Sequence, residues 1–417
     1  MPIIQTLDAL EILDSRGRPT LQVTCTLTSK HQGTASVPSG ASTGKAEAHE
    51  LRDGDQARYR GLGCRKAVQN VRETIHHALS GTDFPSQQSL DEALIALDGH
   101  PNKANLGANA ILGVSLAFAR ACADQEGQPL YERFSAFGNV SPTLPRLTIN
   151  LFSGGKHAGG QVAIQDVLIV PLAATVEQSL ADAFAVYRAA ADLIQQKYGM
   201  RALTADEGGL APSFPSSEAM LQDAMIAIEN ARLTPGQDVA LAVDVASSHF
   251  YTDGRYYLNE TPLSSEAMID QLVEWAKIYP LVSIEDGLAE DDWQNWQKLC
   301  LRLPTSTRVL GDDLLCTNPT RIQRAIDEGA ANALLLKVNQ IGTLTEAFTA
   351  NTLAHQHGWQ VVVSARSGET EDHWLADLAV GWGGDYIKVG SITRSERLAK
   401  YNRLLWIESK TGLAIKS

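Results

Sequence analysis

Eight short apolar runs constrain the fold of the last two thirds of this chain most strongly. Longer amphipathic segments separate most of them, a pattern typical of strands that alternate with helices. Eight such units are what a closed (β/α)8 barrel requires. The first two runs lie close together and precede a long helical stretch, so we predict an α/β barrel that begins irregularly. The runs are residues 147–151, 167–172, 239–243, 281–284, 308–310, 333–336, 360–363 and 386–387.

The first ~135 residues follow a different pattern. Residues 21–27 alternate like a strand, and residues 33–44 are small, polar and rich in turn formers, which predicts a hairpin followed by a mobile loop. Three later segments have the apolar spacing of amphipathic helices, namely 64–79, 87–97 and 109–125.

We therefore expect two domains. An N-terminal α+β capping domain should cover residues 1–135, and a barrel carrying the site should cover residues 140–417. Residues 134–144 contain Gly138, Asn139 and Pro142, which favour a linker.

Charge and cysteine usage exclude several classes of function. The formal net charge of -13 argues against nucleic acid as the main partner, because phosphate backbones are held by clustered Lys and Arg. Charged residues interrupt residues 1–20, and no later segment has about 18 consecutive apolar residues, so we expect a cytoplasmic protein without a membrane partner. The five cysteines are dispersed and form no CxxC pair, which predicts neither a disulfide framework nor a zinc site.

Charged residues follow several of the apolar runs. In a barrel of this type, residues at the C-terminal strand ends surround one pocket, so side chains far apart in sequence should converge. The five residues are Asp244, Glu285, Asp312, Lys337 and Lys388.

The three acids would repel one another unless a cation lay among them. All-oxygen ligation favours a hard ion, and Asp244, Glu285 and Asp312 are predicted to bind Mg2+. The alternative is that each acid caps the helix that follows it, a common role for Asp.

Lys337 is the candidate base. A lysine at the inner end of a buried strand is costly unless it is paired or functional. As a base it would need its pKa lowered towards neutrality, and Mg2+ with Lys388 nearby would act in that direction. The alternative is a structural ion pair with one of the three acids.

Two loops and one strand end supply further candidates. The glycines after Glu207 would let this residue reach across the pocket as a general acid. His157 stands in a glycine-rich segment, although either loop could be an ordinary turn and a lone histidine is more often structural. Arg366 and Ser367 offer a guanidinium and a hydroxyl suited to a phosphoryl group.

Seven motifs, spread over nearly the whole chain, resemble those of the enolase family. The longest include Pro38-Ser39-Gly40-Ala41-Ser42-Thr43-Gly44, the loop 206–209, residues 334–342 and residues 366–372. Shorter ones lie at 13–20, 50–54 and 106–112. Their common order makes a chance match improbable.

The resemblance implies a capping domain on a barrel of order ββαα(βα)6, usually in a homodimer or higher homo-oligomer. It implies two Mg2+ per site, one on the three acids and one on the substrate phosphate and Ser42. The substrate would be a small phosphorylated or phosphonylated carboxylic acid. Lys337 would remove the proton beside the carboxylate. Glu207 would protonate the departing hydroxyl, with Asp166 beside it. The substrate would also contact Gln165, His157, Arg366, Ser367, Lys388 and Ser42.

The chain departs from the family pattern near the substrate. Ala365 stands where enolases usually have His, and Asp166 where they usually have Glu. Smaller changes are Ala205, Gly287 and Val389, in place of Gly, Pro and Thr. We expect dehydration of 2-phosphoglycerate. The alternatives are a paralogue acting on a related phosphonate or carboxyphosphonate in natural-product metabolism, and a non-catalytic scaffold or surface-binding protein.

Overall fold

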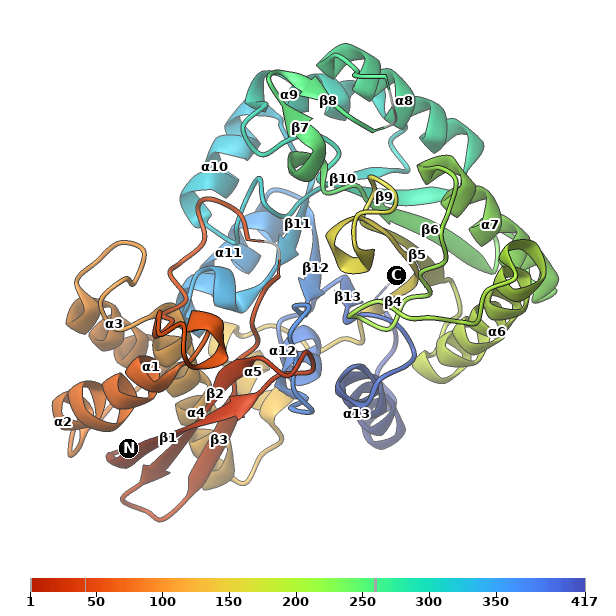
Figure 1. Ribbon diagram of the computed structural model, residues 1–417. Helices are drawn as coiled ribbons and strands as arrows, with labels where there is room; N and C mark the ends of the chain where they lie inside the picture. The colour runs from red at the N-terminus through yellow and green to blue at the C-terminus, as the bar shows by residue number, and fades with distance from the viewer. Residues whose placement is uncertain (1, 42, 259–260, 417) are drawn as a thin grey trace.

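The computed structural model describes residues 2–41, 43–258 and 261–416. Its larger part is a closed barrel with the strand order β10-β11-β12-β13-β4-β5-β6-β9 around the ring (Figure 1). All eight predicted runs form these strands, so the predicted barrel is confirmed. The strands are β4 Arg146–Ser153, β5 Asp166–Pro171, β6 Val239–Asp244, β9 Leu281–Glu285, β10 Arg308–Gly311, β11 Ala333–Leu336, β12 Gln360–Ser364 and β13 Tyr386–Lys388.

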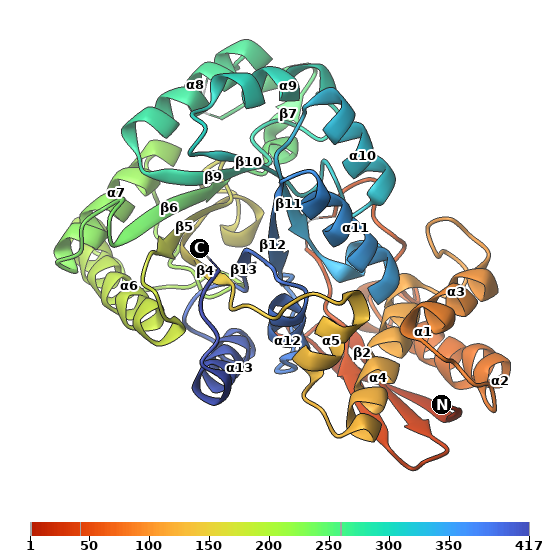
Figure 2. The same ribbon diagram turned by 180° about the vertical axis from the view of Figure 1, so that it is seen from behind.

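The barrel begins irregularly, as predicted. Strand β5 runs antiparallel to both β4 and β6, whereas the other neighbours in the ring are parallel. Two helices follow β5, and six strand–helix units complete the order ββαα(βα)6. The helices surround the barrel (Figure 2). They are α6 Val176–Tyr198, α7 Ser217–Asn230, α8 Ser265–Ile278, α9 Trp293–Arg302, α10 Pro319–Glu328, α11 Leu344–Gln356, α12 Trp374–Gly381 and α13 Ser395–Thr411.

The barrel strands are apolar on both faces because both faces are covered. Along β6, Ala240 and Ala242 pack with Leu168 inside the barrel. Leu241 and Val243 instead join the core between the barrel and its helices. Such burial on two sides explains why these strands appear in the sequence as continuous apolar runs rather than as alternating ones.

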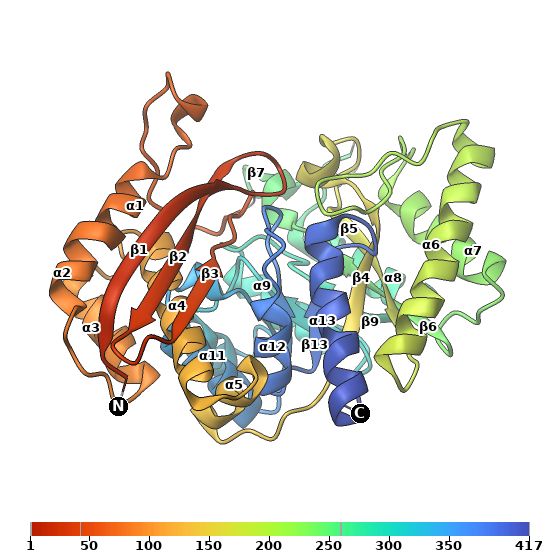
Figure 3. The same ribbon diagram turned by 90° about the horizontal axis from the view of Figure 1, so that it is seen from below.

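The N-terminal part is a three-stranded antiparallel sheet covered by helices (Figure 3). Gly33 lets α4 approach the sheet closely, because a Cβ at this position would overlap the backbone of Ala117. The elements are β1 Ile4–Leu13, β2 Pro19–Leu27, β3 Gln32–Ser36, α1 Arg65–Asn70, α2 His76–Leu79, α3 Gln87–Asp98, α4 Ala108–Glu126 and α5 Leu130–Gly138. A π-helical turn, Val71–Ile75, joins α1 and α2.

One expectation for this part is confirmed and one needs correction. Strand β3 pairs antiparallel with β2, which is the predicted hairpin. Helix α5 extends into the expected linker up to Gly138, and Phe134 is buried in the core. The proposed division at residues 135 and 140 stays a prediction. Within the described ranges, none of the helices combines the length and apolar character needed to cross a bilayer.

The segment after β3 reaches from the N-terminal sheet to the barrel. Ser39 and Gly368 exchange two backbone hydrogen bonds, of 2.8 and 2.9 Å. Farther on, the amide of Ala48 donates to the carbonyl of Gln340 at 2.7 Å. Residues 39–41 and 43–48, called the lid segment below, are thus attached to the loops after β12 and β11.

Candidate functional site

Three carboxylates lie in adjacent positions at one edge of the barrel. Asp166 is paired in register with Asp244, and Asp244 with Glu285. Because β5 runs antiparallel, its first residue lies at the same edge as the last residues of β6 and β9. Asp312 follows directly after β10 at this edge, and all four side chains are buried.

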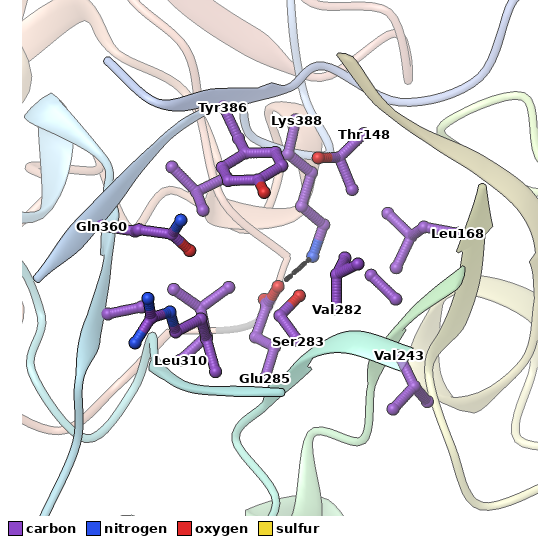
Figure 4. A pocket seen from close by; sticks show the side chains of 14 residues that line it. Thr148, Leu168, Val243, Val282, Ser283, Glu285, Leu310, Gln360, Tyr386 and Lys388 are labelled. Atoms are coloured by element: carbon purple, nitrogen blue, oxygen red, sulfur yellow. Dashed lines mark hydrogen bonds and ion pairs between the residues drawn. The ribbon is translucent and has the colours of Figure 1, made fainter. Parts of the chain in front are cut away.

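Two lysines enter this group from the other strands. Lys388, at the end of β13, places Nζ 2.9 Å from Asp244 Oδ2 and 2.7 Å from Glu285 Oε2. Figure 4 shows the contact with Glu285 inside the barrel. Lys337, directly after β11, donates to Asp312 Oδ2 at 2.5 Å. The five charged residues predicted from the strand ends therefore do converge.

The acids do not cap the helices that follow them. Helix α8 begins at the Ser264 cap and α10 at the Asn318 cap, each with a side-chain hydrogen bond to the backbone. The residue before α9 is Asp292, which makes no such bond. The capping alternative for Asp244, Glu285 and Asp312 is therefore wrong.

The ring order separates the charges into two arcs. Strand β5, with Asp166, lies four places from β11, which precedes Lys337, so these two residues face each other across the ring. The arc through β10, β9 and β6 carries Asp312, Glu285 and Asp244. The other arc, through β12, β13 and β4, carries Arg366, Lys388 and Asn150. Three acids thus come from one side of the opening, and two cationic side chains, Arg366 and Lys388, come from the other.

His157 lies between two acids, Asp166 and Glu207, close to the start of β5. Its Nδ1 lies 2.9 Å from Asp166 Oδ2, and its Nε2 lies 3.9 Å from Glu207 Oε1. Ser153 donates to Asp166 at 2.6 Å, and Asn150 donates to Glu207 at 3.1 Å. These bonds hold both acids beside the imidazole.

The proton of this group resides on the imidazole. Burial lowers the pKa of His157, but the charges of Asp166 and Glu207 reverse this effect and raise it to about 9. Burial raises the pKa of Glu207, yet the charges of His157 and Arg397 outweigh burial and lower it. At neutral pH the predicted general acid is therefore ionised, with a charged histidine beside it.

Lys337 is held by the ion pair that the sequence left open as an alternative. Burial lowers its pKa, but the charges of Asp312 and Glu285 together outweigh burial, and the pKa is raised. The expected lowering towards neutrality is thus absent while Asp312 pairs with this lysine. A base role requires that pair to be weakened.

Arg366 connects the predicted phosphate side to the lid segment. Its Nη1 and Nη2 donate to the Glu47 carboxylate at 3.1 and 3.2 Å, and Nη1 also donates to Asn339 at 2.9 Å. Any side chain at Gly40 would overlap the guanidinium. The hydroxyl of Ser367 accepts from Arg16 at 3.1 Å. Ser42, predicted to bind metal and substrate, lies outside the described residues.

Sequence reasoning missed two residues that organise the site. Glu47 accepts hydrogen bonds from Arg366, from the Gly44 amide and from Gln340. Gln340 also donates to Asp312 Oδ1 at 2.8 Å. Both lie in or next to the quoted motifs, but only the folded chain brings them together.

A third missed residue fixes the backbone of a predicted ligand. The two oxygens of Asp286 accept the amides of Asp312 and Asp313, at 2.9 and 2.8 Å. The position of Asp286 directly after the predicted ligand Glu285 is the sequence signal that could have identified it. These bonds set the position of the turn that presents Asp312.

The donor set at the strand ends fits Mg2+. Asp244, Glu285 and Asp312 offer only carboxylate oxygens, which hard divalent cations prefer. Burial and the charge of Asp244 raise the pKa of Glu285 well above its usual value. A cation bound beside this carboxylate would stabilise its ionised form. The buried Oε1 of Gln165 has no hydrogen-bond partner, while its Nε2 donates to Asp244 at 3.1 Å.

A second acidic group lies close by. Carboxylate oxygens of Asp286, Asp312 and Asp313 lie close enough together to hold an ion. Both Asp286 oxygens already accept backbone amides, so we assign this residue to positioning Asp312.

Two family models match the chain, each over a different part of it. Residues 4–134 match the family model described as Enolase, N-terminal domain. Residues 141–416 match the one described as Enolase, C-terminal TIM barrel domain.

Proposed function

The chain belongs to the enolase family, and we propose that it dehydrates 2-phosphoglycerate to phosphoenolpyruvate. Family membership itself indicates a metal-dependent lyase of the hydratase type acting on a small acid. The finer assignment of substrate, and the roles given below to single residues, are our proposal. The homo-oligomer and the cytoplasmic location stay predictions.

One observation carries this proposal. Lys337 and the group of His157, Asp166 and Glu207 lie on opposite sides of the ring of strands. Removal of water needs a base for the carbon-bound hydrogen and an acid for the hydroxyl on the next carbon. Groups that face each other across one opening can act on two faces of a substrate between them.

The proposed reaction moves two protons. Lys337 acts in its neutral form, so its ion pair with Asp312 must first be weakened and its own proton released to solvent. The C–H bond beside the carboxylate then breaks and its proton goes to Lys337 Nζ, while the electron pair remains on the substrate. The C–O bond on the neighbouring carbon then breaks, and a carbon–carbon double bond forms. The departing hydroxide takes a proton from the acid group, where His157 supplies it through Glu207, and leaves as water.

The remaining residues hold the substrate. Asp244, Glu285 and Asp312 would hold Mg2+, which draws negative charge from the substrate carboxylate and makes the adjacent hydrogen more acidic. Lys388 would contact that carboxylate. Arg366 would bind the phosphoryl group through two parallel hydrogen bonds, a geometry that suits guanidinium.

The departures at Ala365 and Asp166 favour a second candidate substrate. Ala365 is buried between Ser364 and Arg366. The chain thus has a methyl group where enolases usually have a histidine imidazole near the phosphate. Asp166 is one methylene shorter than the usual acid beside the departing hydroxyl. With the metal ligands and Lys337 retained, these changes favour a paralogue that performs the same elimination on a related phosphonate or carboxyphosphonate.

The test is an assay with 2-phosphoglycerate and Mg2+, in which ultraviolet absorbance follows the enol product. We expect turnover in the native protein and only a modest change in the Ala365→His variant. If the native protein is inactive and Ala365→His creates the activity, the paralogue is correct.

A further inference from the structure

Arg397 lies on helix α13, behind the proposed phosphate side of the site. This helix packs against α12 and α6 on the outside of the barrel (Figure 1). The Arg397 side chain is completely buried. Its only ion pair within the described ranges is with the adjacent Glu396, 3.3 Å from Nε. A charged side chain buried this deeply is costly unless its donors are bonded, so the partners of its remaining nitrogens show what the residue does.

Both terminal nitrogens of Arg397 hold the backbone of the phosphate side. Nη1 donates to the carbonyl of Arg366 at 2.7 Å, and Nη2 donates to the carbonyl of Ser367 at 2.6 Å. Two acceptors on consecutive residues suit the planar fork of a guanidinium, and bonds from a charged donor are stronger than neutral ones. Arg397 therefore fixes the peptide groups from which the two proposed phosphate ligands project.

The other polar groups of residues 366–368, called the phosphate turn below, are bonded as well. The Arg366 amide donates to Glu369 Oε1 at 3.1 Å. Lys400, also on α13, donates to Glu369 Oε2 at 3.0 Å. Gly368 exchanges its backbone bonds with Ser39 of the lid segment. The phosphate turn is thus held by α13 on one side and by the lid segment on the other.

Arg397 also adjoins the backbone of the acid side. A side chain at Gly390 would overlap both the Arg397 stem and the carbonyl oxygen of Glu207. That carbonyl accepts the amide of Ser391 at 2.9 Å. Because Gly390 has no side chain, Arg397 and the loop of Glu207 can pack against the same segment after β13. Arg397 therefore lies between the two loops that present the phosphate ligands and the acid.

We propose that Arg397 is a positioning residue for the substrate phosphoryl group. By holding the carbonyls of Arg366 and Ser367, it sets the direction in which their side chains meet that group. The inference rests on the proposed function and adds to it a residue that does not touch the substrate. Asp244, Glu285 and Asp312 come from the other arc of the ring, so the metal ligands should keep their geometry when Arg397 is changed.

Inorganic phosphate is the probe, because it can occupy the phosphate side without the rest of a substrate. Its dissociation constant is measured by calorimetry at constant Mg2+, beside KM and kcat for 2-phosphoglycerate. Arg397→Gln should weaken phosphate binding about tenfold and raise KM by a similar factor, with a smaller change in kcat. Arg397→Lys keeps the charge but lacks the fork of donors, so it should lose about threefold. Arg366→Gln should abolish phosphate binding.

Arg403→Gln is the matched control. Arg403 lies on the same helix and donates to the buried carboxylate of Asp377 on α12 at 2.6 Å. Its loss should weaken the packing of α13 without removing a bond to the phosphate turn. We expect this variant to bind phosphate like the native protein. Mg2+ should raise the melting temperature of Arg397→Gln as it does that of the native protein, because the metal ligands are unchanged.

The outcomes separate the inference from the proposed function. Native phosphate affinity in Arg397→Gln, equal weakening in Arg403→Gln, or no phosphate binding by the native protein overturns the inference. Turnover of 2-phosphoglycerate by the native protein would leave the proposed function standing in each case. If Arg397→Gln does not fold, Arg397→Lys decides, and native phosphate affinity in that variant overturns the inference. If the variants show the expected pattern with phosphate but the native protein does not turn over 2-phosphoglycerate, the proposed function fails and the role of Arg397 is retained.

Discussion

Lys388 Nζ lies between two buried carboxylates, 2.9 Å from Asp244 Oδ2 and 2.7 Å from Glu285 Oε2. The three groups come from β13, β6 and β9, so this contact joins strands on both sides of the ring. Without the ammonium, two buried carboxylates would face each other with their charge uncompensated.

Lys388→Met should therefore destabilise the protein by about 3–5 kcal/mol when metal is chelated, because it breaks a buried ion pair by removing one partner. Added Mg2+ should restore much of this loss, since a divalent ion supplies the missing charge. Urea unfolding with chelator and with Mg2+ measures both effects. Equal destabilisation under the two conditions would contradict a metal site at these acids.

His157 should make stability depend on pH. Burial lowers its pKa, but Asp166 and Glu207 raise it to about 9, above the ordinary value near 6.5. The folded state then binds the proton more tightly, so this contribution is complete below pH 6.5 and is lost as the pH rises through 9. The loss amounts to about 3 kcal/mol. The unfolding free energies measured at pH 6 and at pH 9.5 should differ less in the His157→Gln variant than in the native protein.

Asp312 should be needed for stabilisation by metal. A ligand that binds only the folded state stabilises it by about 2.7 kcal/mol at a hundredfold excess over Kd, and the melting temperature rises accordingly. Mg2+ should raise the melting temperature of the native protein and have little effect on Asp312→Asn. Asp192→Asn, an exposed change on α6, serves as control and should respond like the native protein. A full response of Asp312→Asn would remove Asp312 from the ligand set.

Glu47 should position Arg366 for the phosphoryl group. It accepts from both guanidinium nitrogens and from the amide of Gly44, so it fixes Arg366 and the lid segment together. Glu47→Gln should raise KM about tenfold through the loss of charge-assisted bonds, with a smaller effect on kcat. Glu47→Asp should recover part of the loss. If Glu47→Gln instead lowers kcat and leaves KM unchanged, Glu47 does not act through substrate binding.

The barrel could be predicted because its strands are short, apolar on both faces and ended by charged residues. Strand β1 could not, since exposed and buried positions do not alternate regularly along it, and Leu10 and Leu13 are exposed. Its backbone pairing with β2, rather than its side-chain pattern, keeps it extended.

The site could be predicted only as far as the strand ends reveal it. The convergence of Asp244, Glu285, Asp312, Lys337 and Lys388 follows from strand order alone. The contacts of Glu47 with Arg366 join residues 319 positions apart, and nothing local in either segment indicates the partner. Likewise, the pairing of Lys337 with Asp312 depends on the width of the opening, which no sequence pattern encodes.

The most direct test of the account follows the hydrogen beside the substrate carboxylate. Proton NMR of 2-phosphoglycerate with Mg2+ in deuterated water reports its loss and the appearance of the enol product. We expect both with the native protein. Lys337→Ala should lose at least about a hundredfold in rate, as removal of a general base does, while its circular dichroism stays native. Exchange and product formation at the native rate in Lys337→Ala would contradict the assignment of Lys337 as the base.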